Sequence, residues 1–237
     1  MQTAAPLAAL LLAACGGEPL SALEPAGPAA ESIARAWWLM AAGAAVILLG
    51  VTLLAAYAVW RKSGALPEQA GRRLILAGGV VFPLAVLMLL LGYGLAMGHG
   101  LLPAAGHAGQ PVYRVDVLAR QWQWDVFYPE AEAEGPPRAS VNVLHIPVGQ
   151  PVDVHVSSAD VIHSFWVPRL GGKIDAIPGR VNVVRLQADQ PGAYEGICAE
   201  FCGLAHARMR MQVHAHEPQA LQAQLGQLSR APQGGGR

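Results

Sequence analysis

Two long apolar stretches dominate the first hundred residues of the chain. Residues 36–60 and 74–97 contain no Asp, Glu, Lys or Arg, and each carries Trp or Tyr near an end. About 20 apolar residues in a helix cross a hydrocarbon core of about 30 Å, and aromatic rings favour its borders. Each stretch therefore predicts a transmembrane helix. Pro83 lies inside the second stretch and predicts a kink without a break.

The segment between these stretches, residues 61–73, predicts the orientation of the chain. Its basic residues outnumber its single acid, Glu68, and they are Arg61, Lys62, Arg72 and Arg73. Short loops rich in Lys and Arg stay in the cytoplasm. We therefore expect a two-pass protein of a bacterial inner membrane, with both termini and the region after about Gln110 in the periplasm.

The pattern changes after Gly106 to short alternating or β-branched runs. These runs cover residues 112–118, 140–146, 151–157, 181–187, 192–198 and 209–214, and Pro- and Gly-containing turns separate them. Regularly spaced short strands predict an all-β sandwich or barrel, here over residues 111–217. Residues 218–237 predict a C-terminal helix and tail, in which Leu221, Leu225 and Leu228 form one apolar stripe.

Composition excludes several classes of protein. The chain is 53% hydrophobic and only 14% charged, with 16 basic and 16 acidic residues. This balance argues against a purely soluble protein, a disordered chain and a basic nucleic-acid binder. Three cysteines in 237 residues also exclude a disulfide-rich scaffold. We expect the chain to contact a lipid bilayer and to bind no nucleic acid.

Residues 1–15 carry a signal of their own. The short apolar stretch before Cys15 ends in Leu-Ala-Ala, followed by Cys-Gly, as at a bacterial lipoprotein cleavage site. It is too short to span a membrane. We expect lipidation of Cys15 and loss of residues 1–14. No Lys or Arg precedes this stretch, unlike a typical signal peptide, so a plain tether is the alternative.

The residues with the clearest chemistry lie between Cys198 and Met209. Their pattern is C-x-E-x-C-G-x-x-H-x-x-M, which places two thiols, the imidazole of His206 and a thioether within one short segment. Soft sulfur ligands select copper, zinc or iron–sulfur clusters, and a His–Cys set with a weak Met is typical of copper electron-transfer sites. His163, in the segment VIHSFWVP, is the candidate for a second imidazole.

Each of these residues also has a structural interpretation. Cys198 and Cys202 would form a disulfide in an oxidising compartment, and Met209 would fill a core. Four other histidines, His145, His155, His214 and His216, are interpreted as surface residues. Of these, His214 and His216 share one strand face, where an adventitious metal would bind.

Taken together, the motifs resemble subunit 2 of the haem–copper cytochrome c oxidases. The resemblance covers both apolar stretches and the segments 121–124 (QWQW), 161–168, 172–180 and 198–209. It implies a fold of membrane α plus all-β class. In that fold an N-terminal two-helix transmembrane hairpin precedes a cupredoxin-like β-sandwich or barrel.

The resemblance also implies a metal site. Both thiolates would bridge two coppers of a binuclear CuA centre, each imidazole would bind one copper, and the thioether and a backbone carbonyl would be weak ligands. The implied ligands are Cys198, Cys202, His163, His206, Met209 and the carbonyl of Glu200. The carboxylate of Glu200 would bind magnesium or manganese at the boundary with subunit 1.

Further roles follow from the same resemblance. Trp122 would accept electrons from the donor, whereas Trp124 is expected in the core. Asp175 and Arg180 would face subunit 1. The acids that would attract lysines of cytochrome c, and so speed encounter, are Asp160, Glu130, Glu132 and Glu134.

The implied function is that of the electron-accepting subunit of a cytochrome c oxidase. Electrons from cytochrome c would pass through copper to haem in subunit 1, where oxygen is reduced to water and protons are translocated. Subunits 1 and 3 would be partners. The sequence departs from relatives in two ways. Residues 74–79 lack the acid that many relatives carry at a proton-channel mouth. The sequence also contains no C-x-x-C-H haem motif, so we expect the electron donor to be a separate protein.

Three alternatives have sequence signatures of their own. A thioredoxin-like copper chaperone for oxidase assembly also uses C-x-x-x-C with a distant His, but has one span and no role for His206 or Met209. A quinol oxidase homologue of this subunit lacks the copper ligands. A nitrous-oxide reductase shares the copper motif but needs a large additional catalytic domain.

Overall fold

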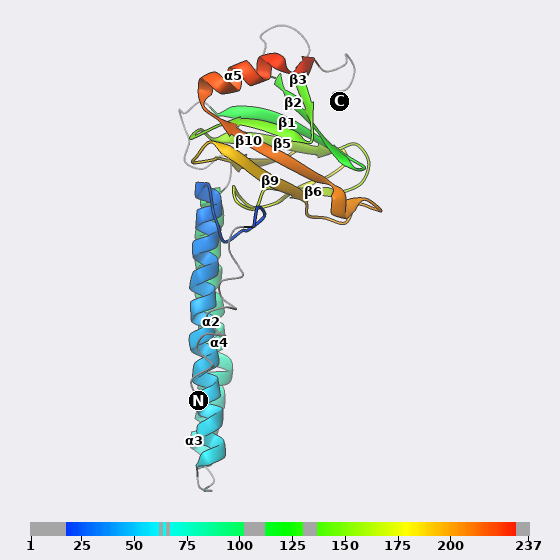
Figure 1. Ribbon diagram of the computed structural model, residues 1–237. Coiled ribbons are helices and arrows are strands. Elements are labelled where there is room, and N and C mark those ends of the chain that lie inside the picture. The colour runs from blue at the N-terminus through cyan, green and yellow to red at the C-terminus, as the bar shows by residue number, and fades with distance from the viewer. Residues whose placement is uncertain (1–17, 62–63, 65–66, 102–111, 130–136, 231–237) are drawn as a thin grey trace, which may run out of the picture. The chain divides into compact units, whose positions relative to one another are not determined.

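The computed structural model describes residues 18–61, 64, 67–101, 112–129 and 137–230 (Figure 1). The chain divides into two units: residues 35–106, and a unit that joins the residues before 35 to those from 107 onward. The first unit is helical and the second contains two β-sheets. The predicted fold class is confirmed, because two long apolar helices precede a β-domain.

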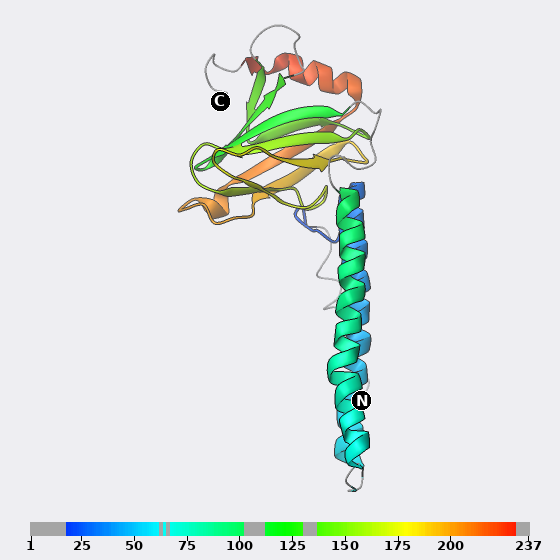
Figure 2. The ribbon, with the colours of Figure 1, turned by 180° about the vertical axis from the view of Figure 1, so that it is seen from behind.

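Both predicted apolar stretches are helical. The first lies in α2 (Pro28–Trp60), and the second in the continuous run α3 (Glu68–Leu76), η2 (Ala77–Val81) and α4 (Phe82–Leu101). Their length and composition suit a membrane span, with mean hydropathies of 2.4 and 2.8. The two helices run alongside each other in opposite chain directions in both views (Figures 1 and 2). Most of their large apolar side chains are exposed, as expected where lipid is the solvent.

The helices extend beyond the apolar stretches that predicted them. Helix α2 begins at Pro28, because proline is well suited to a first helical turn. Helix α3 begins at Glu68, so Arg72 and Arg73 are helical and not part of a loop over residues 61–73. Hydropathy marks what a bilayer can cover, but it does not mark where a helix ends.

Pro83 does not break the second helix. The helix continues to Leu101, and the π-helical turn η2 ends just before Phe82. Proline has no N–H, so the carbonyl four residues earlier loses its helical donor. The wider turn is a common accommodation within an α-helix.

Two sheets form the β-domain. The first has the strand order β11 (Ser229–Arg230), β3 (Arg138–Val141), β2 (Gln123–Tyr128), β1 (Tyr113–Arg120), β5 (Val152–Ser158) and β8 (Asn182–Leu186). The second has the order β4 (Val143–Pro147), β10 (Arg210–His216), β9 (Gly192–Cys198), β6 (His163–Trp166) and β7 (Ile174–Ala176). This two-sheet arrangement is the expected β-sandwich.

The core comes from alternate residues of both sheets. Strands β1, β2 and β5 alternate buried and partly buried positions along their length, as does most of β10. Side chains alternate across a strand, so one face of each sheet is apolar and packs inward. The largest fully buried side chains include Trp124, Tyr128, Phe165, Leu144 and Ile146. The core location predicted for Trp124 is confirmed.

The predicted single strand over residues 140–146 is wrong. It is two strands, β3 and β4, which belong to different sheets. Asn142 lies between them with φ of 57°, a left-handed conformation that Asn tolerates better than most residues. Its side-chain oxygen accepts the N–H of Trp124 at 2.8 Å, which stabilises the crossing from one sheet to the other.

The C-terminal helix is α5 (Pro218–Gln227). Leu221 and Leu225 are buried, as the apolar stripe predicted, and Leu228 packs partly against the core just after the helix. The helix ends at Gln227, and Ser229 and Arg230 then pair with β3.

Residues 18–27 form a strap on the β-domain. The N–H of Ala26 donates to the carbonyl of Arg169 at 2.7 Å, and the N–H of Asp189 donates to the carbonyl of Ala26 at 2.9 Å. Gly27 is buried against Gln187, and a Cβ at this position would overlap the Gln187 carbonyl oxygen. The first helix is thus preceded by a segment fastened to the β-domain.

This contact predicts a strong effect of Gly27→Ala. The added methyl group collides with backbone, which cannot rotate away, so the strap must shift at a cost of about 1–3 kcal/mol. We expect a lower melting temperature and faster amide exchange at residues 18–27. Gly226→Ala is the matched control, because a Cβ there meets nothing within 4 Å. Equal melting temperatures for the two variants would contradict the packing.

Candidate metal centre

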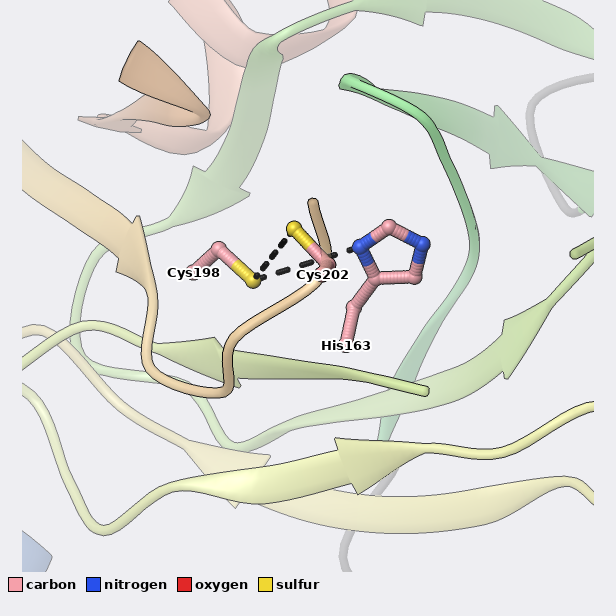
Figure 3. A group of neighbouring side chains, drawn as sticks. All are labelled: His163, Cys198 and Cys202. Carbon is pink, nitrogen blue, oxygen red and sulfur yellow. Dashed lines mark hydrogen bonds between the residues drawn. The ribbon is translucent and has the colours of Figure 1, made fainter. Parts of the chain in front are cut away.

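The second sheet brings the predicted ligands together. Cys198 ends β9, the segment 199–209 follows, and β10 begins directly after Met209. His163 begins β6, whose Phe165 pairs with Cys198. The ligand atoms of His163, Cys198 and Cys202 all lie within 4.8 Å of one another (Figure 3).

The two thiols occupy the centre of the group. Their Sγ atoms are 3.8 Å apart and both cysteines are free. A disulfide would require about 2.05 Å, so the disulfide interpretation does not hold in this structure. The Nδ1 atom of His163 lies 4.0 Å from the Sγ of Cys198, and the Nδ1 of His206 lies 3.6 Å from the Sγ of Cys202. Each imidazole therefore faces a different sulfur.

Two weaker donors complete the cluster. The Sδ of Met209 is 3.8 Å from the Sγ of Cys202, and the carbonyl oxygen of Glu200 is 3.2 Å from the Sγ of Cys198. We call these six residues the sulfur cluster: Cys198, Cys202, His163, His206, Met209 and Glu200.

Burial controls the chemistry of the cluster. His163, Cys198, Cys202 and Met209 are buried, whereas His206 is partly exposed. Burial, together with the neighbouring Cys198, raises the pKa of Cys202 to about 12. That thiol therefore stays protonated until a metal displaces its proton, since only the thiolate is a ligand.

Asp160 supports His163 from outside the cluster. Its Oδ1 lies 2.8 Å from the Nε2 of His163, and its Oδ2 accepts the N–H of Gln121 at 2.7 Å. Burial acts to raise the pKa of Asp160, but hydrogen bonds from His163, Gln121 and Val161 outweigh it and lower this pKa. An ionised carboxylate holds the proton of His163 on Nε2 and leaves Nδ1 free to bind a metal.

Asp160→Asn should therefore weaken metal binding. His163 and Gln121 face different oxygens of Asp160, and an amide has only one oxygen, so one of these two donors would face the NH2 group. Loss of such a second partner typically costs roughly 10–100-fold in metal affinity. Chelator competition with the copper-loaded chain measures this change. Asp116→Asn, which alters a surface acid paired with Arg114, is the control. Equal copper retention by both variants would exclude the role of Asp160.

Trp122 lies against the cysteine loop. Its Nε1 donates to the carbonyl of Cys202 at 3.3 Å, and Gln121 Nε2 donates to the same carbonyl at 2.8 Å. The indole is 37% exposed. Gly203 has φ of +120°, and a Cβ there would lie 3.3 Å from the indole, so glycine allows this close approach. Gln121 and Gly203 lie within the segments 121–124 and 198–209 that carry the resemblance, but neither was assigned a role from the sequence.

The other predicted site residues lie in different settings. Asp175 accepts hydrogen bonds from Ser164 at 2.8 Å and Lys173 at 3.1 Å, and these two donors lower its pKa. Ser164 follows His163, so Asp175 lies next to the cluster. Arg180 is exposed. Four predicted residues lie outside the described part of the chain: Cys15, Glu130, Glu132 and Glu134.

Comparison with known proteins gives the family. The family profile described as "Cytochrome C oxidase subunit II, periplasmic domain" matches residues 137–216. Cytochrome c oxidase subunit 2 of Cereibacter sphaeroides is 30% identical over an alignment of 224 residues that covers 77% of this chain and 71% of that protein. The chain belongs to the cytochrome c oxidase subunit II family. The resemblance stated from the motifs is confirmed.

Other members of the subunit II family differ in their named electron donor. Cytochrome c oxidase subunit 2 of Alkalihalophilus pseudofirmus is 34% identical over 223 residues, 88% of this chain and 62% of that protein, so the chain spans less than two thirds of it. Ubiquinol oxidase subunit 2 of Acetobacter aceti is 31% identical over 222 residues, 87% of this chain and 68% of that protein. Sequence identity therefore does not distinguish a cytochrome c donor from a quinol donor. The residues of the site have to make that distinction.

For a subunit II protein, the donor set of the sulfur cluster fits copper. It offers two thiols, two imidazole nitrogens, a thioether and a carbonyl oxygen. Thiolate and imidazole with a long thioether contact is a copper combination, and zinc rarely recruits methionine.

Proposed function

We propose that the chain is the electron-accepting subunit of a cytochrome c oxidase. Electrons from cytochrome c would be taken up at a binuclear CuA centre and passed to haem in subunit 1, where oxygen is reduced to water and protons are translocated. The observation that carries this proposal is the pair of free thiols 3.8 Å apart, with one imidazole Nδ1 beside each sulfur. Two thiolates at this spacing suit bridging between two metals, and each imidazole then suits one of them.

The protein's own residues prepare the site for this role. Bound copper would supply one-electron exchange. The two cysteines, His163, His206, Met209 and the Glu200 carbonyl would hold it. His163 lies on β6 and Cys198 on β9, and the other four residues lie in the loop that joins β9 to β10. Both ends of that loop are anchored in one sheet, so the ligands move little when charge changes. Burial excludes water, and Asp160 keeps the proton of His163 away from the ligand atom.

Trp122 is the proposed point of electron uptake. Its exposed indole offers a π-surface to a donor, and its hydrogen bond to the Cys202 carbonyl connects that surface directly to a ligand residue. Asp160 remains a proposed docking acid together with Glu130, Glu132 and Glu134. Because the same carboxylate is hydrogen-bonded to His163, Asp160 would both attract the donor and orient a copper ligand.

Several finer proposals accompany this function. The exposed carboxylate of Glu200 would bind magnesium or manganese at the boundary with subunit 1, where Asp175 and Arg180 would also lie. Subunit 3 would complete the assembly. The basic residues of segment 61–73 support a cytoplasmic position for that segment and a periplasmic position for the β-domain. Cys15 would add a lipid anchor.

The main alternatives fit this chain less well. A thioredoxin-like copper chaperone does not require His206 and Met209 beside the thiols, and its fold is not built from two β-sheets. A quinol oxidase subunit does not require a complete set of copper ligands. The Acetobacter aceti relative, named as a ubiquinol oxidase subunit, makes the quinol alternative the one to test.

The test is donor choice by the intact oxidase that contains this chain. We expect oxygen consumption with reduced cytochrome c and none above background with a ubiquinol analogue. Removing copper with a chelator should abolish the cytochrome c activity. Quinol oxidation that persists after copper removal would contradict the proposal. A purified oxidase that lacks this chain would instead favour the chaperone.

A further inference from the structure

Three histidines gather on the second sheet, away from the sulfur cluster. His145 is on β4, and His214 and His216 are on β10, where His214 pairs directly with His145. We call them the histidine cluster. The prediction that all three are surface residues is wrong for His145, which is only 6% exposed. Their strand neighbours Leu144, Val213 and Ala215 are in the core, so the three rings lie on the opposite face.

The rings are arranged around one another. His145 Nδ1 and His216 Nε2 face each other at 2.9 Å. The ring of His214 stacks against both, with centroids 5.7 Å from His145 and 6.1 Å from His216. The backbone N–H of His145 donates to the Tyr128 hydroxyl at 2.8 Å, which fixes the strand beneath its ring.

We propose that the histidine cluster is a second metal site, which binds one Cu²⁺ ion between His145 Nδ1 and His216 Nε2. The ligand atoms of the three histidines do not all lie within 4.8 Å of one another, and His214 Nε2 lies 3.3 Å from Gln212 Oε1, so His214 becomes a third ligand after its ring turns toward the ion. Two nitrogens at about 2.0–2.1 Å from one ion lie about 2.8–3.0 Å apart at an angle of about 90°, and about 3.3–3.4 Å apart at a tetrahedral angle. The observed 2.9 Å is already the separation that the tetragonal geometry of Cu²⁺ requires, and each ring has only to turn its lone pair from the other nitrogen toward the ion. Zn²⁺ would require the rings to separate.

The protonation state also favours a metal. The two facing nitrogens share one hydrogen, and a neutral imidazole can move its proton to its other nitrogen. Both rings can therefore face the ion with no net loss of protons. Burial, together with the neighbouring histidines, lowers the pKa of His145 to about 4, and burial lowers the pKa of His216. Both rings are then uncharged at neutral pH and do not repel a cation.

The site would join an edge strand to its neighbour. In the second sheet β4 is the outermost strand and pairs with β10. An ion held by residues of both strands links them through side chains as well as backbone. Binding should therefore raise the melting temperature of the chain, since a ligand that binds only the folded state stabilises it.

The experiment uses the full chain without an affinity tag, with its sulfur cluster already loaded with copper. Cu²⁺ is titrated in, and electron paramagnetic resonance (EPR) detects the new ion. We expect one additional Cu²⁺ per chain with an affinity of about 10 µM or tighter, a mononuclear signal with nitrogen hyperfine splitting and a higher melting temperature.

Two substitutions test the assignment against a matched control. His216→Gln should weaken binding of the additional ion at least about tenfold, and His214→Gln, a second variant in case the first does not fold, should reduce the number of nitrogens in the EPR signal. His155→Gln, on β5, should change neither. Absence of a tight additional ion, or equal binding by all three variants, would overturn the proposal and leave a hydrogen-bonded pair of neutral histidines.

Discussion

Cys202→Ser should abolish the binuclear copper centre. The Cys202 sulfur lies within 4 Å of three other donors, Cys198, His206 and Met209, so its loss removes the position at which those groups converge. A serine hydroxyl is a hard, neutral donor at neutral pH and does not replace a thiolate that bridges soft metal ions. We expect copper content well below two per chain, loss of near-infrared absorption and loss of cytochrome c oxidation.

The control for this substitution is Cys15→Ser. It makes the same chemical change at the cysteine proposed for lipidation and should leave copper content and absorption unchanged. The melting temperature of the copper-free chain should be similar for Cys202→Ser and the unaltered protein, because the change is small and local. Retention of both copper and near-infrared absorption by Cys202→Ser would refute the ligand assignment.

Trp122→Phe should slow electron uptake while copper stays bound. Phenylalanine keeps a partly exposed ring but loses the indole N–H that donates to the Cys202 carbonyl at 3.3 Å. The direct connection between donor surface and ligand residue is then broken. We expect turnover with cytochrome c to fall by roughly tenfold or more, with little change in copper content.

Trp166→Phe is the matched control for this prediction. The indole of Trp166 also donates to a backbone carbonyl, that of Gly171 at 3.1 Å, but this carbonyl is not part of the sulfur cluster. Its replacement should leave electron uptake near normal. Unchanged turnover of Trp122→Phe with saturating donor would remove Trp122 from the route.

The sequence predicted most of the architecture where a pattern was long, although the six-residue strand β2 (Gln123–Tyr128) was missed. The two apolar helices follow from uncharged runs of more than 20 residues, and β5 and β9 follow from clear alternation. The short strands β6 and β7 did not, because three or four residues are too few to show a period. The division of 140–146 was missed because one left-handed Asn, hydrogen-bonded to Trp124, redirects a run that otherwise has the composition of a single strand.

The candidate site was likewise predicted only in part from the sequence. The copper donors were predicted because most of them lie within twelve residues, and the spacing of that motif is distinctive. Its supporting contacts were not predicted, since they join residues far apart in the chain. Gln121 reaches Asp160 and Cys202, which are 39 and 81 residues away, and only the fold brings them together. The burial of His145 was not predicted for a related reason. It follows from the parallel pairing of β4 with β10, and no local sequence pattern indicates that pairing.

The most direct test of the proposed function is to count metals and record EPR on the full chain reconstituted with copper, before the histidine cluster is filled. The account predicts two copper ions in the sulfur cluster that share one unpaired electron. That result would establish a binuclear centre held by Cys198, Cys202, His163 and His206. A single copper with an ordinary mononuclear signal, or no tightly held copper, would contradict the account.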